Sequence, residues 1–276
     1  MRKLLFEFED LSWFPDTIRE SMTDYLRYFL KVTKFYKPVI PFISEILKQT
    51  NLQNIIDLCS GSGGPVEEVL SGLNATSEGN IKVTLTDKFP NISSYTLLQN
   101  KYPKSISFES TSIDAKNVPE ELKGLRTIFS GIHHFDEVSI GEIIHNAIQN
   151  NAPIGIFDGG DRNIFMILGI ILFHPLLFFL FTPFFRPFRI SRLIFTYLIP
   201  IIPFCTVCDG IVSITRLYAP EHLERIARVH DEARYTSVGG VYPSDKSSST
   251  ASKKAITEHF VSDAPRPHTL PSAMSP

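Results

Sequence analysis

Residues 55–65 read IIDLCSGSGGP, and this stretch decides the fold. A short apolar run that carries Asp57 leads into a turn of small residues, and Pro65 follows at a position typical of the first turn of a helix. Gly61 and Gly63 let the backbone adopt positive φ angles and approach a ligand closely. A strand, a Gly-rich turn and a helix in this order predict a nucleotide-type site at the carboxyl end of a strand in an α/β sheet.

Three ligand classes compete for such a turn. A P-loop requires Gly-Lys-Ser/Thr, which does not follow here. A dinucleotide fingerprint requires a third glycine where Val66 stands. The turn therefore fits a ligand without phosphates, such as S-adenosylmethionine, and its structural alternative is a tight strand–helix turn that binds nothing.

Downstream of the turn, apolar runs alternate with helical patterns. This alternation predicts a mostly parallel sheet with right-handed crossovers and helices on both faces. The expected strands are 55–59, 81–87, 106–113, 127–132 and 154–157, and the expected helices between them are 91–101 and 135–149. Upstream, apolar residues at helical spacing predict a helical cap over residues 1–50.

Two further carboxylates stand where strands of this sheet end. Asp87 ends the second expected strand, and its carboxylate can accept hydrogen bonds from both hydroxyls of a ribose. Asp114 ends the third expected strand and can accept from an adenine amino group. A loop or turn role is the alternative for each residue, but three polar strand ends in series favour a binding site.

Taken together, five stretches resemble the class I (Rossmann-like) S-adenosylmethionine-dependent methyltransferase family. They are IIDLCSGSGGP at 55–65, VTLTDK at 83–88, STSIDA at 110–115, IFSGIHHF at 128–135 and IGIFDGG at 154–160. The resemblance implies S-adenosylmethionine as cofactor, bound by Asp57, Ser60, Gly61, Gly63, Asp87 and Asp114. Residues 209–226 resemble the family's late strand and helix, with the strand expected at 210–217, and 235–242 is a candidate for the last strand.

Two adjacent histidines follow the fourth expected strand, where the family often places acceptor-site residues. Either His133 or His134 can serve as a catalytic base, but neighbours on an extended segment point to opposite sides, so chelation of a metal by the pair is not expected. Asp158, after the fifth strand, is a candidate for the acceptor cavity. Cys205 and Cys208 form one CxxC without a second pair, so no metal site is expected there either.

The apolar residues are concentrated at 164–208, which we call the apolar block. Its two runs are interrupted by prolines and separated by Arg186, Arg189 and Arg192. Three arrangements remain open, which are a shallow hairpin in one membrane leaflet, a hairpin that spans the membrane, and a lid over an apolar acceptor. The shallow hairpin is favoured, because its arginines can stay near the lipid headgroups.

The sequence therefore predicts four parts, a helical cap at 1–50, a methyltransferase domain at 51–163 and 209–243, the apolar block, and a disordered tail at 244–276. Near-balanced charge, with 27 Lys+Arg and 29 Asp+Glu, gives no reason to expect a nucleic-acid partner. Three cysteines favour a reducing, cytoplasmic location.

The predicted function is methyl transfer to a small acceptor by a protein that associates with a membrane surface, and apolar, lipid-like and aromatic molecules are the candidate acceptors. The alternatives are a non-catalytic membrane-associated scaffold or sensor and, less favoured, a nicotinamide-dependent oxidoreductase.

Overall fold

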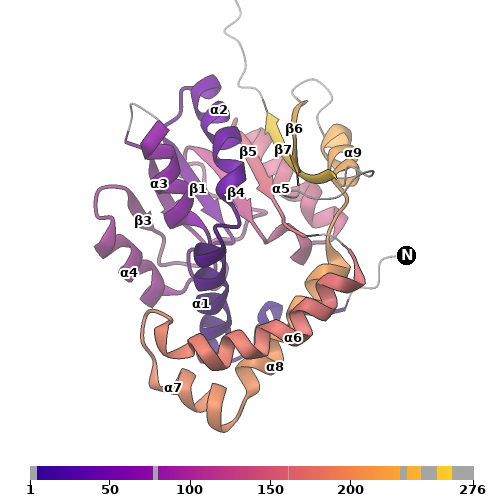
Figure 1. Ribbon diagram of the computed structural model, residues 1–276. Coiled ribbons are helices and arrows are strands. Elements are labelled where there is room, and N and C mark those ends of the chain that lie inside the picture. Colours follow the sequence, from indigo (N-terminus) through magenta and orange to yellow (C-terminus); the bar gives the residue numbers. More distant parts are fainter. Residues whose placement is uncertain (1–4, 77–79, 161, 231–234, 244–253, 263–276) are drawn as a thin grey trace, which may run out of the picture.

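A five-stranded parallel sheet forms the centre of the molecule (Figure 1). The computed structural model describes residues 5–76, 80–160, 162–230, 235–243 and 254–262. The strand order is β3-β2-β1-β4-β5, which is the order of a Rossmann-like sheet, and the fold class predicted from the sequence is confirmed. The strands are β1 (Asn54–Leu58), β2 (Lys82–Leu85), β3 (Ile106–Phe108), β4 (Leu125–Phe129) and β5 (Ile154–Phe157).

Helices cover both faces of this sheet. One apolar cluster joins the strands to the helices on one face, and a second cluster joins them to the helices on the other. The first face carries α2 (Ile40–Thr50), α3 (Val66–Thr76) and α4 (Ile92–Lys101), and the second carries α5 (Glu137–Gln149) and α9 (Pro220–His230). Every residue of β4 and β5 is consequently buried, including Arg126 and Thr127 of β4, whose side chains bond to Asn146 and Asp57.

Two antiparallel strands, β6 (Tyr235–Pro243) and β7 (Lys254–Ser262), complete the structure, and β7 lies beside β5. The strand predicted at 235–242 is therefore present. The prediction of a disordered tail is wrong for 254–262, because this segment pairs along its length with β6. The rest of that tail, 244–253 and 263–276, lies outside the described residues.

The apolar block folds as helices packed against α1 (Asp16–Thr33), below the sheet in Figure 1. A 3-10 turn at Thr182–Phe184 also belongs to the block, whereas the 3-10 turns at Phe8–Asp10, Lys37–Val39 and Ile132–His134 lie outside it. The block comprises α6 (Ile164–Phe181), α7 (Ile190–Leu193), a π-helical turn at Ile194–Leu198 and the start of α8 (Ile201–Arg216).

The strand predicted at 210–217 is wrong, because residues 210–216 continue α8 and Leu217 follows its end. Asp209, Ser213 and Arg216 recur at helical spacing, and all three side chains contact the N-terminal segment 7–10. These contacts stabilise a helix despite the β-branched residues between them. α8 therefore crosses the expected boundary between the apolar block and the methyltransferase domain.

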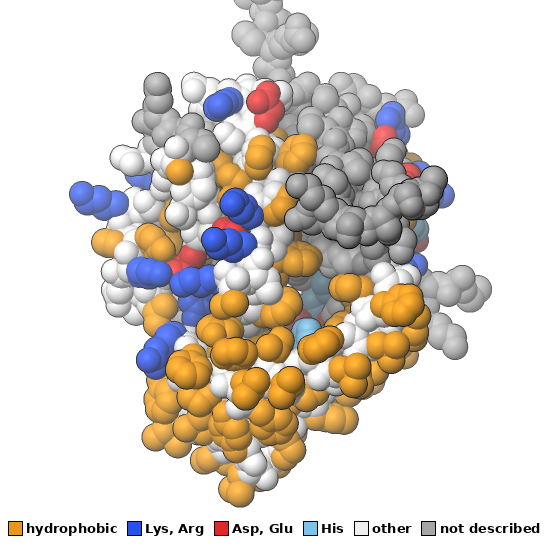
Figure 2. Space-filling model, in the orientation of Figure 1, with side chains coloured by type: hydrophobic (Ala, Val, Ile, Leu, Met, Phe, Trp, Pro, Cys, Tyr) orange, Lys and Arg blue, Asp and Glu red, His pale blue; other side chains and the backbone are white. Residues whose placement is uncertain are grey.

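The outer face of the apolar block exposes hydrophobic side chains (Figure 2). Of the 18 residues of α6, only Ile170 and Phe178 are buried. Judged by length and composition, the stretch Ile164–Phe184 is long and apolar enough to cross a membrane, and the pair Ile190–Leu198 and Ile201–Arg216, bent by 79°, passes the same test together.

The arginines between the two apolar runs do not all lie free for lipid headgroups. Arg192 is 1% exposed and forms an ion pair with the buried Asp24 of α1, and Arg189 pairs with Glu20 of the same helix. Only Arg186 of the three is exposed. The predicted headgroup position is wrong for Arg192, because a buried carboxylate on α1 binds it.

Candidate functional site

The turn after β1 has an unusual backbone. Cys59, Gly61, Gly63 and Gly64 all have positive φ angles. At Gly63, a Cβ atom would lie 2.3 Å from Cδ1 of Leu98 on α4, so this glycine permits close packing of the turn on that helix. At Gly61, a Cβ atom would meet Cγ2 of Thr23 at 3.4 Å. Only Gly61 of these two lines the cavity described below.

Asp57 lies behind the turn, 2% exposed, and does not line the cavity. Its Oδ2 accepts a 2.6 Å hydrogen bond from Ser60 Oγ, and its Oδ1 accepts one of 2.7 Å from Thr127 Oγ1. Burial raises the pKa of Asp57 to about 7, against the effect of these two donors. Asp57 therefore holds the turn in shape, and Ser60, which does line the cavity, stands between it and a ligand.

Asp87, just beyond the end of β2, faces the turn. Its Oδ2 accepts a hydrogen bond of 2.7 Å from the backbone N–H of Gly61, and its Oδ1 accepts one of 2.7 Å from that of Phe89. Because a carboxylate offers about four acceptor sites, these two bonds orient the group and leave capacity for a ligand. Burial raises its pKa.

A cavity of about 570 Å³ lies at the carboxyl ends of the strands. It is within the size range of small-molecule and cofactor sites. Four of the six predicted cofactor residues line it, namely Ser60, Gly61, Asp87 and Asp114. Asp114 Oδ1 accepts a 2.9 Å hydrogen bond from the Lys116 N–H, and its neighbours Ile113 and Ala115 add apolar wall beside it.

Helix α1 forms the opposite wall. Several of its residues line the cavity, namely Asp16, Arg19, Glu20, Thr23, Leu26, Arg27 and Leu30. Others, namely Ile18, Met22 and Tyr25, pack against the apolar block. None of residues 164–208, all of which are described, lines this cavity. The lid arrangement is therefore wrong as a direct cover. Helix α1 lies between most of the block and the cavity, and Arg189 of the block bonds to the cavity-lining residues Glu20 and Asn91.

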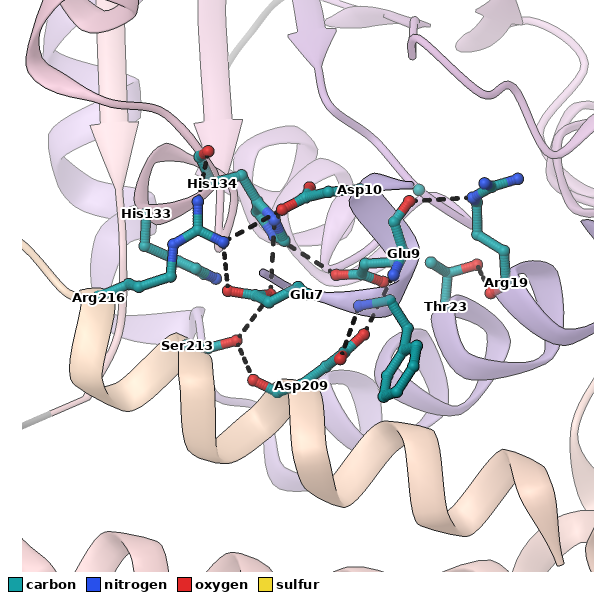
Figure 3. Close-up of polar contacts among 12 residues, drawn as sticks. Glu7, Glu9, Asp10, Arg19, Thr23, His133, His134, Asp209, Ser213 and Arg216 are labelled. Atoms are coloured by element: carbon teal, nitrogen blue, oxygen red, sulfur yellow. Dashed lines mark hydrogen bonds and ion pairs between the residues drawn. The ribbon is translucent and has the colours of Figure 1, made fainter. Parts of the chain in front are cut away.

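At the far end of the cavity, acidic residues from segment 7–10 surround His134 (Figure 3). His134 Nδ1 lies 2.8 Å from Asp10 Oδ1 and 3.5 Å from Glu7 Oε2, and its Nε2 lies 3.4 Å from Glu9 Oε1. Arg216 Nη1 lies 3.1 Å from both Glu7 Oε1 and Asp10 Oδ2. Asp209 accepts from the N–H groups of Phe8 and Glu9 at 2.8 and 3.2 Å.

The electrostatics of this cluster follow from its burial and its crowding with carboxylates. Desolvation opposes a charge on His134, but the fields of Glu7, Asp10 and Glu9 prevail and raise its pKa to about 10. Burial raises the pKa of Glu9 to about 8, although His134 lowers it in part. Burial likewise raises the pKa of Asp209 to about 6.

His133 is buried and takes no part in lining the cavity. Its Nδ1 lies 2.8 Å from Asp158 Oδ2, so Asp158 holds this ring and does not line the cavity either. The prediction that the two histidines point to opposite sides is wrong. Residues 132–134 form a 3-10 turn, not an extended segment, and the two ring centroids lie 4.5 Å apart.

Segment 7–10 was missed by the sequence analysis. Its partners Asp209 and Arg216 are some 200 residues away along the chain, so no local pattern around Glu7 indicates the contact. The signal lies in α8, where Asp209, Ser213 and Arg216 interrupt an apolar helix on one face.

Comparison with known proteins supports the fold. No protein-family model matches the sequence, and no curated protein matches it. Among solved structures, the plantazolicin methyltransferase BpumL in complex with SAH is similar, with a TM-score of 0.54 and 15% identity over 93% of this chain and 94% of that one.

Two further solved structures also align with the chain. The plantazolicin methyltransferase BamL, in complex with a desmethyl analogue and SAH, matches over 91% of this chain and 99% of its own at 16% identity, with a TM-score of 0.48. Human N-acetylserotonin methyltransferase in complex with SAM matches over 90% of this chain and 58% of its own at 11% identity, also with a TM-score of 0.48. The likeness to BpumL shows that the chain has the class I methyltransferase fold.

Proposed function

We propose that the chain is an S-adenosylmethionine-dependent methyltransferase that acts on a small molecule and associates with a membrane surface. The observation that carries the catalytic part is the joint position of the Gly61 turn and the Asp87 carboxylate on one wall of the cavity. Both come from the carboxyl ends of neighbouring strands, where α/β sheets bind their ligands.

The residues present fit this cofactor. Asp87 would accept the ribose hydroxyls, and Asp114, beside Ile113 and Ala115, would accept from the adenine amino group. The Gly61 region would meet the amino-acid end, with Ser60 in front of the Asp57 carboxylate. When bound, S-adenosylmethionine supplies a methyl group on a positively charged sulfur.

The chain's own contribution would be alignment. Attack on a methyl group requires the nucleophile, carbon and sulfur in line, and holding the two reactants in place supplies most of the rate increase. His134 would orient the acceptor, because it lies on the cavity wall and is itself held by Asp10. His133 would act only through its neighbours, since it does not reach the cavity.

Calorimetric titration with S-adenosylmethionine tests the cofactor site. We expect one site per chain, and Asp87→Asn should weaken binding roughly tenfold to hundredfold, because a lost charged acceptor typically costs about 1–3 kcal/mol. Glu109→Gln on the same protein is the matched control and should leave the affinity unchanged, because Glu109 does not line the cavity. Equal affinity in folded Asp87→Asn and wild type would refute this assignment.

The membrane part rests on the exposed face of the apolar block. At its N-terminal end α6 packs on α8 through Ile170, and at the other end Phe178 stacks on Tyr25 of α1 with ring centroids 4.0 Å apart. A helix held to the domain at both ends lies along its surface. We therefore propose that α6 lies in the plane of one leaflet, which disfavours a spanning hairpin, with the methyltransferase domain in the cytoplasm.

This arrangement suits an amphiphilic acceptor, the class that we favour. α1 is a wall shared by the apolar block and the charged cavity, so its two faces meet an apolar and a polar environment. A molecule with an apolar tail in the membrane and a polar reacting group has the shortest route to the cavity along this helix.

Flotation with vesicles of phosphatidylcholine and phosphatidylglycerol tests the membrane part. Wild-type protein should float, and Leu172→Glu and Leu198→Glu should bind roughly tenfold to hundredfold more weakly, because each removes about 1.5–3 kcal/mol of apolar burial. Val138→Glu, at an equally exposed apolar position on α5, is the control and should float like wild type. Wild-type protein that stays monodisperse at the bottom of the gradient would refute membrane association.

A further inference from the structure

The apolar block meets a cluster of basic side chains at the segment between α6 and α7. Figure 2 shows Lys and Arg side chains gathered beside the hydrophobic face, on the side of α1 and α4. Arg186 lies in this segment and is exposed, and the phenylalanines on either side of it, Phe184 and Phe188, are 62% and 53% exposed. Basic and exposed apolar side chains are therefore neighbours at this edge of the block.

Hydrogen bonds and ion pairs connect Arg186 to further members of the cluster. Its backbone carbonyl accepts a hydrogen bond from Nη2 of Arg27 on α1, and Nη1 of Arg27 lies 3.9 Å from Oε2 of Glu67 on α3. The same carboxylate pairs with Lys31 of α1 at 3.2 Å and with Lys101 of α4 at 2.6 Å. Arg27 and Glu67 are buried, whereas the two lysine side chains are half exposed. A buried carboxylate thus holds two surface lysines next to the segment that carries Arg186.

Two more lysines extend the cluster beyond the end of α1. Lys34 and Lys37 are exposed, and both lie close enough to Glu68 of α3 for their charges to act on its carboxylate. Arg27, Lys31 and Lys34 recur at helical spacing, so they share one side of α1 and its C-cap. We call the exposed members the basic rim, which consists of Lys31, Lys34, Lys37, Lys101 and Arg186.

The basic rim has an excess of positive charge. Together with Arg27 it brings six cationic side chains to the carboxylates of Glu67 and Glu68. We propose that the basic rim binds the headgroups of anionic lipids while the outer side of α6 enters the same leaflet. This inference rests on the membrane association proposed above and adds the charge of the lipid surface that the protein binds.

The position of the basic rim suits this partner. The chain as a whole has a formal net charge of −2, so its overall charge gives no attraction to an anionic membrane. Salt screens charges beyond about 10 Å, so the charges next to the inserted face decide the interaction with headgroups. Lysine and arginine beside exposed phenylalanine and leucine are typical of helices that lie in the membrane interface, where the basic side chains attract anionic lipids.

Flotation of the full-length protein tests the rim, with vesicles of phosphatidylcholine alone and with added phosphatidylglycerol. Wild type should bind the anionic vesicles roughly tenfold to hundredfold more tightly, since each basic side chain near such a surface contributes about a fivefold factor. High salt should remove this gain and leave binding to phosphatidylcholine unchanged, because salt screens charges and not apolar burial.

Two triple variants separate the rim from the total charge. Lys34→Gln/Lys37→Gln/Arg186→Gln leaves every partner of Glu67 in place and should lose most of the preference for anionic vesicles. Lys48→Gln/Lys82→Gln/Lys123→Gln is the matched control. It removes the same charge from exposed positions near the amino ends of the strands, at the edge of the sheet opposite the cavity, and should bind like wild type.

Equal affinity of wild type for the two kinds of vesicle would overturn the proposal, as would an equal loss of preference in the two triple variants. Tighter binding to soluble heparin than to the anionic vesicles would also overturn it, and would indicate a nucleic acid or an acidic protein as the partner. If the rim variant does not fold, the salt dependence of wild type decides. Binding to phosphatidylcholine that persists in these cases would leave the membrane association through α6 intact, so the two proposals can fail separately.

Discussion

Strands β4 and β5 and helix α6 consist mainly of apolar residues, yet the strands are buried and the helix is exposed. Every residue of the two strands is buried, whereas α6 buries only Ile170 and Phe178 of its 18 residues. The strands have helices over both faces, and α6 has α1 and α8 on one side only. Apolar character therefore does not decide burial by itself, and the uncovered side of α6 is where an external partner would act.

The largest expected effect on stability is a difference between substitutions on the buried and the exposed side of α6. Phe178→Ala should lower the free energy of unfolding by about 3–5 kcal/mol, because this ring is fully buried against Tyr25. Leu172→Ala, at a position that is 66% exposed, should change it by less than about 0.5 kcal/mol in water. Urea denaturation without detergent measures both, and equal losses would show that α6 is covered within the chain after all.

The attachment of the apolar block to α1 gives the second prediction. Asp24→Asn should lower the free energy of unfolding by about 3–5 kcal/mol, because it leaves the buried guanidinium of Arg192 without its ion pair. Asp16→Asn removes an ion pair whose carboxylate is 81% exposed and should lower it by less than about 1 kcal/mol. A loss in Asp24→Asn no greater than that in Asp16→Asn would mean that this pair does not hold the block.

The buried carboxylate of Asp57 on β1 should make the stability of the protein depend on pH. Burial raises the pKa of Asp57 to about 7, so the unfolded chain releases this proton at lower pH than the folded protein. Its contribution should therefore lower stability as pH rises from about 4 to about 7, by at most about 4 kcal/mol, and stay constant above. Denaturation of wild type and Asp57→Asn across this range should show the variant gaining relative stability with pH, and a constant difference would contradict the shift.

The smallest effect concerns the turn. Gly63→Ala should lower the free energy of unfolding by about 2–4 kcal/mol, from backbone strain and the close approach to Leu98. Gly64→Ala, also at positive φ but with nothing within 4 Å of a Cβ, should lose only about 1–2 kcal/mol. Thermal and chemical denaturation of the two variants would isolate the contribution of packing at residue 63. Equal losses in both variants would show that the close approach to Leu98 contributes nothing.

The strands and the turn could be predicted from the sequence because their signals are local. The apolar run before Gly61 and the acids at strand ends identify the sheet and place Asp87 and Asp114 on the cavity wall. The direction in which the residues of the turn face could not be predicted in this way. Whether Asp57 and Gly63 face the ligand or the protein depends on Thr127 and Leu98, which belong to other elements.

The prediction failed where distant segments determine the structure. The β-branched residues of 210–217 favour a strand, but contacts from Asp209 and Arg216 to segment 7–10 keep them helical. Arg192 was expected near headgroups because only its neighbours in sequence were considered, and Asp24, 168 residues away, binds it instead. Both errors come from tertiary contacts that override a local preference.

Methyl transfer itself is the central claim, and it can be measured directly. The full-length protein is incubated with S-adenosylmethionine labelled on the methyl group and an extract of cellular lipids and small molecules. Wild-type protein should produce a labelled, solvent-extractable product, and folded Asp87→Ala should produce much less. If wild-type protein binds S-adenosylmethionine but labels nothing above the Asp87→Ala background, the enzymatic account is contradicted and a non-catalytic scaffold or sensor fits the fold better.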